Sequence, residues 1–330
     1  MQNTLSVINL SAIRSNALKV KSMISGAKFF AVVKADAYGH GALEVSHEIE
    51  DIVDGFCVAI VDEGVALRVG GITKPILVFA PPLDEEDGQR IKYYNLTATV
   101  TNEDNARLSQ GCRFHIAVNT GMNRYGCNVS DLSKLIKKLD KSALDGVYSH
   151  LFLAEDGCES VKQLLAFKRA EEIVKDKCPS ATAHLSASGG IVRGGSYLCD
   201  GVRCGIMLYG YSPAGFKVRG LTPALKVFAP LAQKTKCFGG GVGYNLADKK
   251  YDKLYTYRLG YADGFSRNMP LGEKTLCMDA FVSEERHKLF PAMTDAEEYA
   301  KRLDTISYEV LCSVTRRSKK IYERRAEIQI

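Results

Sequence analysis

The first two-thirds of the chain repeat one pattern: a short apolar run rich in β-branched residues, then a longer segment with apolar residues at helical spacing. Short apolar runs are typical of buried strands, and apolar residues three and four positions apart are typical of helices. The predicted strands cover residues 28–33, 55–60, 75–79, 96–101, 113–118, 146–149, 182–185 and 202–208. The clearest predicted helices cover residues 10–24, 41–50, 130–139 and 161–177.

Strands that alternate with helices indicate an α/β fold with a parallel sheet, and about eight such units predict a (β/α)8 barrel of the TIM type. In such a barrel the functional residues lie where the strands end and the following loops begin. Residues at strand ends are therefore the first candidates for a site.

The pattern changes after residue 223. Runs at 231–237, 254–259, 275–282 and 308–314 are predicted strands separated by Gly, Asp and Lys turns. One helix is predicted at 294–303, opened by Thr294 with Asp295 in its first turn. We therefore predict a barrel domain over 1–223 and a smaller, mostly β domain over 224–330. A first strand, at 4–10, precedes the barrel helices and is a candidate to pair with the C-terminal domain.

Composition narrows the class of protein. Of the 330 residues, 46% are hydrophobic and 25% are charged, which is typical of a globular protein and excludes a disordered or fibrous one. No run reaches the roughly 20 apolar residues that cross a bilayer, so we expect no membrane partner. The first residues lack a basic region followed by an apolar run, so we expect no secretory signal and a cytoplasmic location.

Neither the cysteines nor the basic residues indicate a metal or a nucleic acid. The ten cysteines are scattered, without the paired spacing of a zinc site, and we expect them to pack as small hydrophobic residues. The net charge is only +6, although basic residues gather near the C-terminus. Because Glu323 and Glu327 interrupt this cluster, a solvated surface is favoured over nucleic-acid binding. The cluster comprises Arg316, Arg317, Lys319, Lys320, Arg324 and Arg325.

The candidate chemistry begins at Lys34, in the sequence AVVKADAYGHG of residues 31–41. A lysine that ends an apolar strand points into the mouth of a barrel, where desolvation disfavours the ammonium form and frees the amine to form a Schiff base. A lysine at a strand end can equally extend its amine into solvent, and the lysine alone favours that simpler interpretation.

The surrounding residues decide between the two, because they resemble the cofactor-lysine motif of the alanine racemase family. Further blocks that resemble this family follow in the same order: NTGMNR at 119–124, SHL at 149–151, HLSAS at 184–188, VRCGI at 202–206, YG at 209–210, GYADG at 260–264 and CMD at 277–279. The resemblance implies pyridoxal phosphate as cofactor, and a barrel followed by a β-rich C-terminal domain.

The resemblance also implies which residues hold the cofactor. Lys34 would bind it covalently. Tyr38, Ser188 and the backbone N–H groups of Gly205 and Ile206 would hold the phosphate, a task suited to hydroxyls and exposed amides.

Three further residues take roles from the family. Arg203 would face the pyridine nitrogen, and an arginine there keeps the ring largely unprotonated, which favours racemisation over transamination. Racemisation needs acid–base groups on both faces of the α-carbon, and Tyr261 would be the partner of Lys34. His150 would bridge Tyr261 to Arg203.

The substrate contacts are implied in the same way. Arg124 would contact the cofactor's phenolic oxygen and the substrate carboxylate, and Met278 and Asp279 would line the pocket. In the family, the residues that match Tyr261 and Met278 act in the neighbouring subunit. The resemblance therefore implies a homodimer with two-fold symmetry and shared active sites.

The sequence departs from the family at several places. Ala117 stands where many members have a carbamylated lysine that orients the arginine, and Asn119 stands where aspartate is common. Arg124 would need another orienting group, for example a bound chloride. The segment 265–277 is short, and Arg316 takes the place of a phosphate-binding tyrosine.

These observations predict a racemase that interconverts L- and D-alanine, with serine or another small or basic amino acid as an alternative substrate. A second alternative is a pyridoxal-phosphate-binding homologue that has lost efficient racemisation and serves in cofactor handling or regulation. Lys34 and Tyr261 together favour the enzyme, whereas Ala117 and the short segment favour the alternative. A decarboxylase is disfavoured because its usual C-terminal cysteine motif is not evident.

Overall fold

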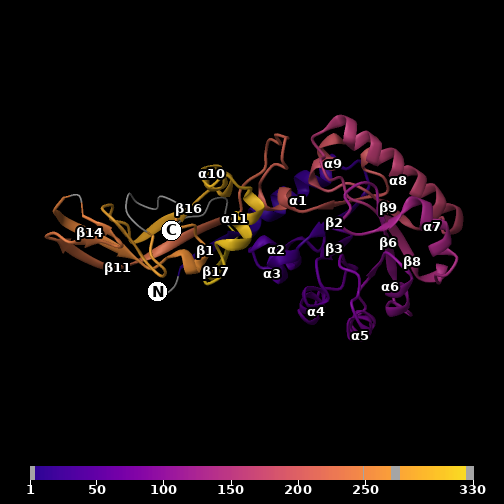
Figure 1. Ribbon diagram of the computed structural model, residues 1–330, viewed down its shortest axis with the longest axis horizontal. Coiled ribbons are helices and arrows are strands. Elements are labelled where there is room, and N and C mark those ends of the chain that lie inside the picture. Colours follow the sequence, from indigo (N-terminus) through magenta and orange to yellow (C-terminus); the bar gives the residue numbers. More distant parts are fainter. Residues whose placement is uncertain (1–3, 248, 269–275, 325–330) are drawn as a thin grey trace. The chain divides into compact units, whose positions relative to one another are not determined.

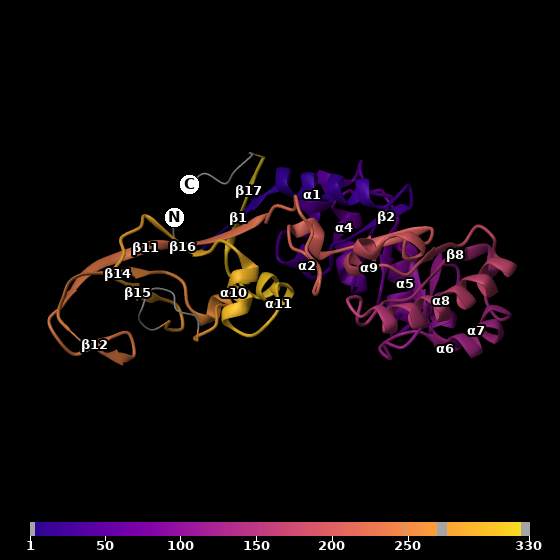
Figure 2. The same ribbon diagram turned by 90° about the horizontal axis from the view of Figure 1, so that it is seen from above.

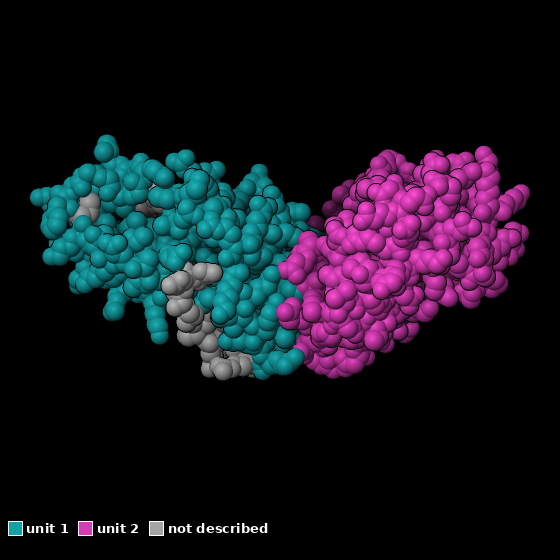
Figure 3. All heavy atoms as spheres, turned by 90° about the horizontal axis from the view of Figure 1, so that it is seen from below, with its two compact units in different colours: residues 1–12, 38–41, 223–330 teal, residues 13–37, 42–222 magenta. Residues whose placement is uncertain are grey.

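A computed structural model describes residues 4–247, 249–268 and 276–324. The chain forms two compact units, which Figure 3 shows in different colours. Unit 1 comprises residues 1–12, 38–41 and 223–330, and unit 2 comprises residues 13–37 and 42–222. Among the described residues, no helix combines the length and the apolar character that a membrane span requires.

Unit 2 is built on parallel strands with helices outside them (Figures 1 and 2). One sheet has the order β10-β2-β3-β4, with β10 Gly201–Cys204, β2 Lys28–Val32, β3 Gly55–Val58 and β4 Ile76–Val78. The second has the order β5-β6-β8-β9, with β5 Ala98–Val100, β6 Phe114–Asn119, β8 Leu144–Tyr148 and β9 Thr182–His184, while β7 Cys127–Asn128 pairs with β6. A parallel bridge between Leu77 and Thr97 links the two sheets. Each of the eight predicted strands overlaps an observed one.

Helices alternate with these strands along the chain, with α1 before the first strand β2 and turn η3 after the last strand β10. They are α1 Leu10–Met23, α3 Ala42–Ile49, α4 Val61–Val69, α5 Glu85–Tyr93, α6 Glu103–Leu108, α7 Val129–Ile136, α8 Gly157–Lys177 and α9 Ser188–Arg193, with 3-10 turns η1 Lys141–Ala143, η2 Gly195–Tyr197 and η3 Ile206–Tyr209. The predicted strand at 202–208 is therefore half wrong, because it ends at Cys204 and turn η3 follows.

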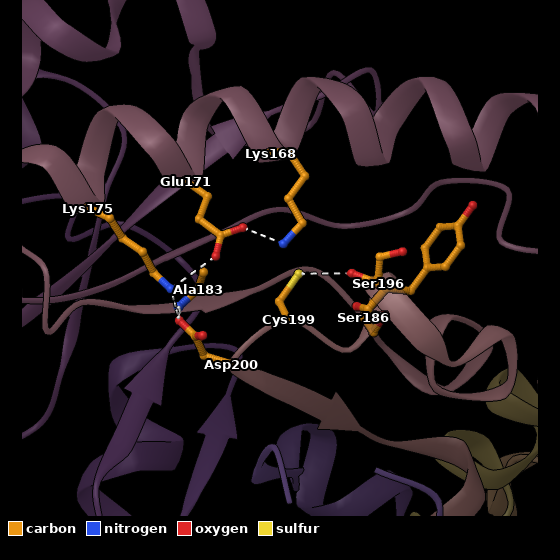
Figure 4. A network of polar contacts seen from close by, with 9 residues as sticks. Lys168, Glu171, Lys175, Ala183, Ser186, Ser196, Cys199 and Asp200 are labelled. Carbon is orange, nitrogen blue, oxygen red and sulfur yellow. Dashed lines mark hydrogen bonds and ion pairs between the residues drawn. The ribbon is translucent and has the colours of Figure 1, made fainter. Parts of the chain in front are cut away.

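The longest helix, α8, is tied to the ends of two strands by a polar network (Figure 4). Lys175 Nζ lies 2.7 Å from Asp200 Oδ2, which also accepts a hydrogen bond from the Ala183 backbone N–H at 2.9 Å. Glu171 pairs with Lys175 at 3.1 Å and with Lys168 at 2.6 Å. Since Asp200 directly precedes β10 and Ala183 lies in β9, the network fixes the helix to the strands that carry Arg203 and His184.

Unit 1 contains a sheet of order β15-β14-β11-β1-β17, with β16 paired to β11. Strand β1 runs antiparallel to β11 and parallel to β17, so the N-terminal strand does pair with C-terminal residues. The elements are β1 Leu5–Asn9, β11 Leu225–Cys237, β12 Gly241–Val242, β13 Asn245–Leu246, β14 Tyr251–Tyr257, η4 Tyr261–Asp263, β15 Phe281–Ser283, β16 Leu289–Met293, α10 Ala296–Arg302, α11 Ser307–Ser313 and β17 Lys319–Glu323.

Three predicted elements of this unit need correction. The predicted strand at 308–314 is helix α11, whose buried residues Val310 and Leu311 and buried C-cap residue Val314 recur at helical spacing. The predicted helix at 294–303 is α10, which begins two residues later, at Ala296. Its N-cap is Asp295 rather than Thr294, and Asp295 accepts hydrogen bonds from two backbone N–H groups of the first turn. Strand β15 begins only at Phe281; of the strand predicted over 275–282, residue 275 lies outside the described residues.

Candidate active site

Lys34 lies two residues beyond the end of β2 and begins a left-handed turn, Lys34–Tyr38. Ala35, Asp36, Ala37 and Tyr38 have φ angles of 52° to 53°, in the left-handed region. For a residue other than glycine, this conformation costs roughly 1–2 kcal/mol of free energy, so surrounding contacts must stabilise the turn.

Three hydrogen bonds stabilise it within unit 2. The Ala35 N–H donates to Glu63 Oε1 at 2.6 Å, and Asp36 Oδ1 accepts from the Ala42 N–H at 2.8 Å. The Ala37 N–H donates to the Val33 carbonyl at 2.9 Å. The residues after Lys34 are therefore held in one conformation by contacts on both sides.

Three buried polar side chains of unit 2, Arg203, His184 and His115, contact one another in a row. Arg203 Nη1 lies 2.8 Å from His184 Nδ1, and His184 Nε2 lies 2.7 Å from His115 Nδ1. A guanidinium can only donate, so His184 Nδ1 accepts and His184 Nε2 carries the proton that it donates to His115. Both imidazoles are therefore neutral in this arrangement.

Burial explains why they stay neutral. Desolvation, followed by the positive charge of Arg203, lowers the pKa of His184 well below its usual range. Desolvation also lowers the pKa of His115 to about 4, with Arg203 adding to the effect and Asp145 opposing it. A second proton on His184 would face the Arg203 guanidinium.

Arg203 is itself almost fully buried, at 2% exposure. Its Nη1 also donates to the His184 carbonyl at 2.6 Å, and its Nη2 donates to the Leu185 carbonyl at 3.0 Å and to the Ser149 carbonyl. The Arg203 Cζ atom lies 5.1 Å from the centre of the Tyr148 ring. Burial lowers the pKa of Arg203, yet carbonyls and an aromatic face stabilise the charged form.

His150 follows β8 and lies among positive charges. Burial first, and then the charges of Arg203, Arg124 and Lys34, lower the pKa of His150 to about 3. Burial raises the pKa of the Cys57 thiol to about 12, and the charges of Arg203 and Lys34 oppose this shift. The charges of three predicted site residues of unit 2, Lys34, Arg124 and Arg203, therefore all act on His150, and together they create a positive potential suited to phosphate and carboxylate groups.

Asn119 shapes the loop that carries Arg124. Asn119 Oδ1 accepts from the Gly121 and Asn123 N–H groups at 3.0 and 3.1 Å, and its Nδ2 donates to Asn123 Oδ1 at 2.9 Å. Asn123 is itself left-handed, at φ 57°. The Asn119 amide thus serves both as hydrogen-bond acceptor and as donor in this loop. Ala117, two residues before it, is buried.

Ser188 and Gly205 form a polar corner where α9 and η3 begin. The Gly205 N–H donates to Ser188 Oγ at 3.4 Å, and Ser188 Oγ lies 3.5 Å from Cys204 Sγ. Ser188 and Ile206 are the first residues of α9 and η3. The first N–H groups of a helical segment have no acceptor within that segment, so two helical starts and one hydroxyl are a donor set suited to a phosphate.

Tyr261 lies in unit 1, in turn η4, and its backbone is pinned to a neighbouring segment. Its N–H donates to the Cys277 carbonyl at 3.1 Å, and the Ala262 N–H donates to the Met278 carbonyl at 3.0 Å. A Cβ atom on Gly260 would overlap the Met278 carbonyl. Only glycine allows this close approach, so the Tyr261 and Met278 segments form one structure with both side chains exposed.

An arginine connects the carboxylates of the same two segments. Arg317 Nη1 lies 2.8 Å from Asp279 Oδ1, and Arg317 Nε lies 3.5 Å from the buried Asp263. Asp263 Oδ2 also accepts from the Gly260 N–H at 2.8 Å. Both Arg316 and Arg317 are exposed, and Arg317, a member of the basic C-terminal cluster, is paired with carboxylates.

Tyr38 also belongs to unit 1, where its ring centre lies 5.9 Å from that of Tyr308. Of the short segment 265–277, residues 269–275 lie outside the described residues.

Comparison with known proteins identifies the family. The profile of the family described as "Alanine racemase, N-terminal domain" matches residues 8–213. The alanine racemases of Streptococcus agalactiae and Ligilactobacillus salivarius are each 32% identical to the chain, over 97% and 98% of it and 98% of their own length. The chain belongs to the alanine racemase family.

Solved structures of this family have the same fold. An alanine racemase of Clostridium difficile superimposes with a TM-score of 0.87 at 28% identity, covering 99% of this chain and 97% of that one. An alanine racemase of Bacillus anthracis with bound L-Ala-P gives a TM-score of 0.87 at 26% identity, covering 99% and 96%. The predictions of a pyridoxal-phosphate-dependent amino-acid racemase and of a small amino-acid substrate are confirmed.

The site residues of this alanine racemase family member fit its cofactor. The donor corner at Ser188 and Gly205 suits a phosphate, and the charges of Lys34, Arg124 and Arg203 suit an anionic ligand.

Sequence reasoning left several supporting residues without a role: His115, His184, Glu63 and Arg317. His115 and His184 are polar residues within otherwise apolar strands, which was the available signal. Glu63 and Arg317 gave none for their long-range contacts, because Ala35 lies 28 residues from Glu63 and Asp279 lies 38 residues from Arg317.

Proposed function

We propose that Lys34 and Tyr261 are the two acid–base groups of a reaction that interconverts L- and D-alanine. The observation that carries the proposal is that the charges of Lys34, Arg124 and Arg203 all act on His150, which lies two residues beyond the end of β8. The rigid mounting of Tyr261 on the Met278 segment supports the second base.

The residues that would hold the cofactor follow from their chemistry. Lys34 Nζ would form the covalent bond, and the Ser188 hydroxyl with the Gly205 and Ile206 amides would bind the phosphate, together with the Tyr38 hydroxyl. The contacts of Arg203 described above use Nη1 and Nη2, so we assign its Nε to the pyridine nitrogen. Because Arg203 can only donate, it holds that nitrogen unprotonated.

Bound pyridoxal phosphate supplies the electron-withdrawing ring that makes the α-proton of an amino acid acidic. Arg124, a planar fork of donors, would bind the substrate carboxylate, with Met278 and Asp279 lining the pocket. Tyr261 Oη would take the α-proton of the L-amino acid, and Lys34 Nζ would deliver a proton to the opposite face. Neutral His150 would connect Tyr261 to Arg203.

We further propose that eight parallel strands of unit 2, β2 to β6 and β8 to β10, close into one barrel. The bridge between Leu77 and Thr97 supports continuity from β4 to β5. On the other side, the Arg203 N–H donates to the Ser186 carbonyl at 2.8 Å, and the Asp200 N–H donates to the Ala183 carbonyl at 2.9 Å. These bonds support continuity from β9 to β10, so the domains would be a barrel over 1–223 and a mostly β domain over 224–330.

A homodimer would complete each site. Tyr261 and Met278 are exposed large side chains on unit 1, at 38% and 52% exposure, whereas the cofactor lysine lies in unit 2. We assign Tyr261 and Met278 of one subunit to the site of the other, in a two-fold arrangement.

The reaction is tested with a panel of L-amino acids in D2O. Chirality analysis should show D-alanine carrying deuterium at the α-carbon, formed faster than any other D-amino acid. Faster conversion of serine or a basic amino acid would identify that amino acid, rather than alanine, as the preferred substrate. If the cofactor-loaded protein converts no amino acid, the proposed function is contradicted.

A further inference from the structure

Glu63 contacts two segments of unit 2 through one carboxylate. It is the third residue of α4, and its Oε2 accepts hydrogen bonds from the Ala59 N–H at 2.7 Å and the Ile60 N–H at 3.4 Å. Its Oε1 accepts from the Ala35 N–H at 2.6 Å. Neither the sequence pattern nor the proposed reaction gives this residue a role.

The contacts of Oε2 are ordinary helix capping. Asn105, the third residue of α6, makes the same contacts, since its Oδ1 accepts from the Thr101 and Asn102 N–H groups at 2.8 and 3.2 Å. The contact of Oε1 has no counterpart in capping. It leaves the helix and reaches the residue next to Lys34.

The Ala35 N–H belongs to the peptide that joins Lys34 to Ala35. A hydrogen bond donated by this N–H to a carboxylate fixes the peptide plane, and therefore the backbone ψ angle of Lys34 and the direction in which its side chain leaves the strand. Ala35 is also the first of the four left-handed residues, a conformation that alanine avoids by itself. The carboxylate thus stabilises an unfavourable turn at the point where it begins.

We propose that Glu63 is a positioning residue, whose Oε1 holds the left-handed turn and so directs the Lys34 amine. The inference rests on the proposed role of Lys34 as the cofactor lysine. Glu63 acts through Ala35 and touches neither cofactor nor substrate.

The test compares Glu63→Ala with the matched control Asn105→Ala. Both variants remove a capping acceptor, so both should unfold at lower urea concentration than the wild type. Glu63→Ala should also raise the dissociation constant of pyridoxal phosphate by about tenfold or more, the effect of losing a hydrogen bond to a charged group. Asn105→Ala should leave that constant within about twofold.

A second variant separates positioning of the turn from general damage. Glycine adopts left-handed angles freely, so Ala35→Gly should make the turn less dependent on Glu63. In the Ala35→Gly background, Glu63→Ala should weaken cofactor binding about threefold less than it does in the wild type. The measurement is a double-mutant cycle on the dissociation constant, with urea unfolding recorded for each protein.

The outcomes are distinct. Equal cofactor affinity of Glu63→Ala and Asn105→Ala, or an undiminished effect of Glu63→Ala in the Ala35→Gly background, would overturn the inference. Borohydride reduction of the wild-type protein followed by peptide mapping separates this from failure of the proposed function. A cofactor label on a lysine other than Lys34 overturns the proposed function, whereas a label on Lys34 with unchanged affinity in Glu63→Ala overturns only the positioning role.

Discussion

Arg203 Nη1 lies 2.8 Å from His184 Nδ1, and this contact makes His184 a proton donor to His115 on its other side. These two hydrogen bonds form only while both imidazoles are neutral, because a protonated His184 would present a hydrogen to Arg203, which can only donate. These contacts therefore link the protonation state of His184 and His115 to the orientation of Arg203.

The first prediction concerns the dependence of stability on pH. The pKa of His115 is about 4 and that of His150 about 3, whereas an unfolded histidine titrates near ~6.5. Between these values the unfolded chain binds protons that the folded one does not, so stability falls as pH decreases below ~6.5. Each histidine should contribute up to about 1.4 kcal/mol per pH unit to the free energy of unfolding.

Urea unfolding of the holoenzyme between pH 5 and 6.5 measures this slope, in a range where most carboxylates stay ionised. His115→Gln keeps an oxygen that can accept from His184 and should reduce the slope by about one proton. A slope that is unchanged in this variant would show that His115 does not resist protonation in the folded protein.

The second prediction concerns Gly260, whose Cα lies against the Met278 carbonyl. Gly260→Ala should force the Tyr261 and Met278 segments apart, lowering the free energy of unfolding by roughly 1–3 kcal/mol and reducing kcat. Gly157→Ala is the matched control, since a Cβ there meets nothing within 4 Å. Equal free energies of unfolding and equal kcat values for the two variants would argue that the contact between the Tyr261 and Met278 segments does not hold Tyr261 in place.

The sequence predicted the strands of unit 2 well because their signal is local. Residues 28–33 are a largely apolar run followed by Lys34, and β2 forms within it. It failed for 308–314, where Val310 and Val314 suggested a strand although their burial follows helical spacing in α11.

The site was predicted residue by residue, but its supports were not. The left-handed turn after Lys34 depends on Glu63, 28 residues away, and no local pattern of Ala35–Ala37 predicts it. The pairing of Arg317 with Asp263 and Asp279 is equally long-range, so the sequence presented Arg317 only as one of several basic residues.

The third prediction concerns the shared site. Lys34→Ala and Tyr261→Phe should each be inactive, but mixed dimers would contain one site with both wild-type residues. After subunit exchange the mixture should recover part of the racemase activity, at most about a quarter of the wild-type activity per chain when exchange is random. No recovery in mixtures proven to have exchanged subunits would exclude sites shared between subunits.

The central claim is that Tyr261 and Lys34 act on opposite faces of the substrate, and α-hydrogen exchange of Tyr261→Phe tests it most directly. The variant, loaded with cofactor, is incubated in D2O with L-alanine or D-alanine, and loss of the α-hydrogen is followed by NMR. Because Lys34 remains, exchange into D-alanine should persist, while exchange into L-alanine should fall by at least about a hundredfold and racemisation with it. Exchange into L-alanine at nearly the wild-type rate would contradict the account and show that another group is the second base.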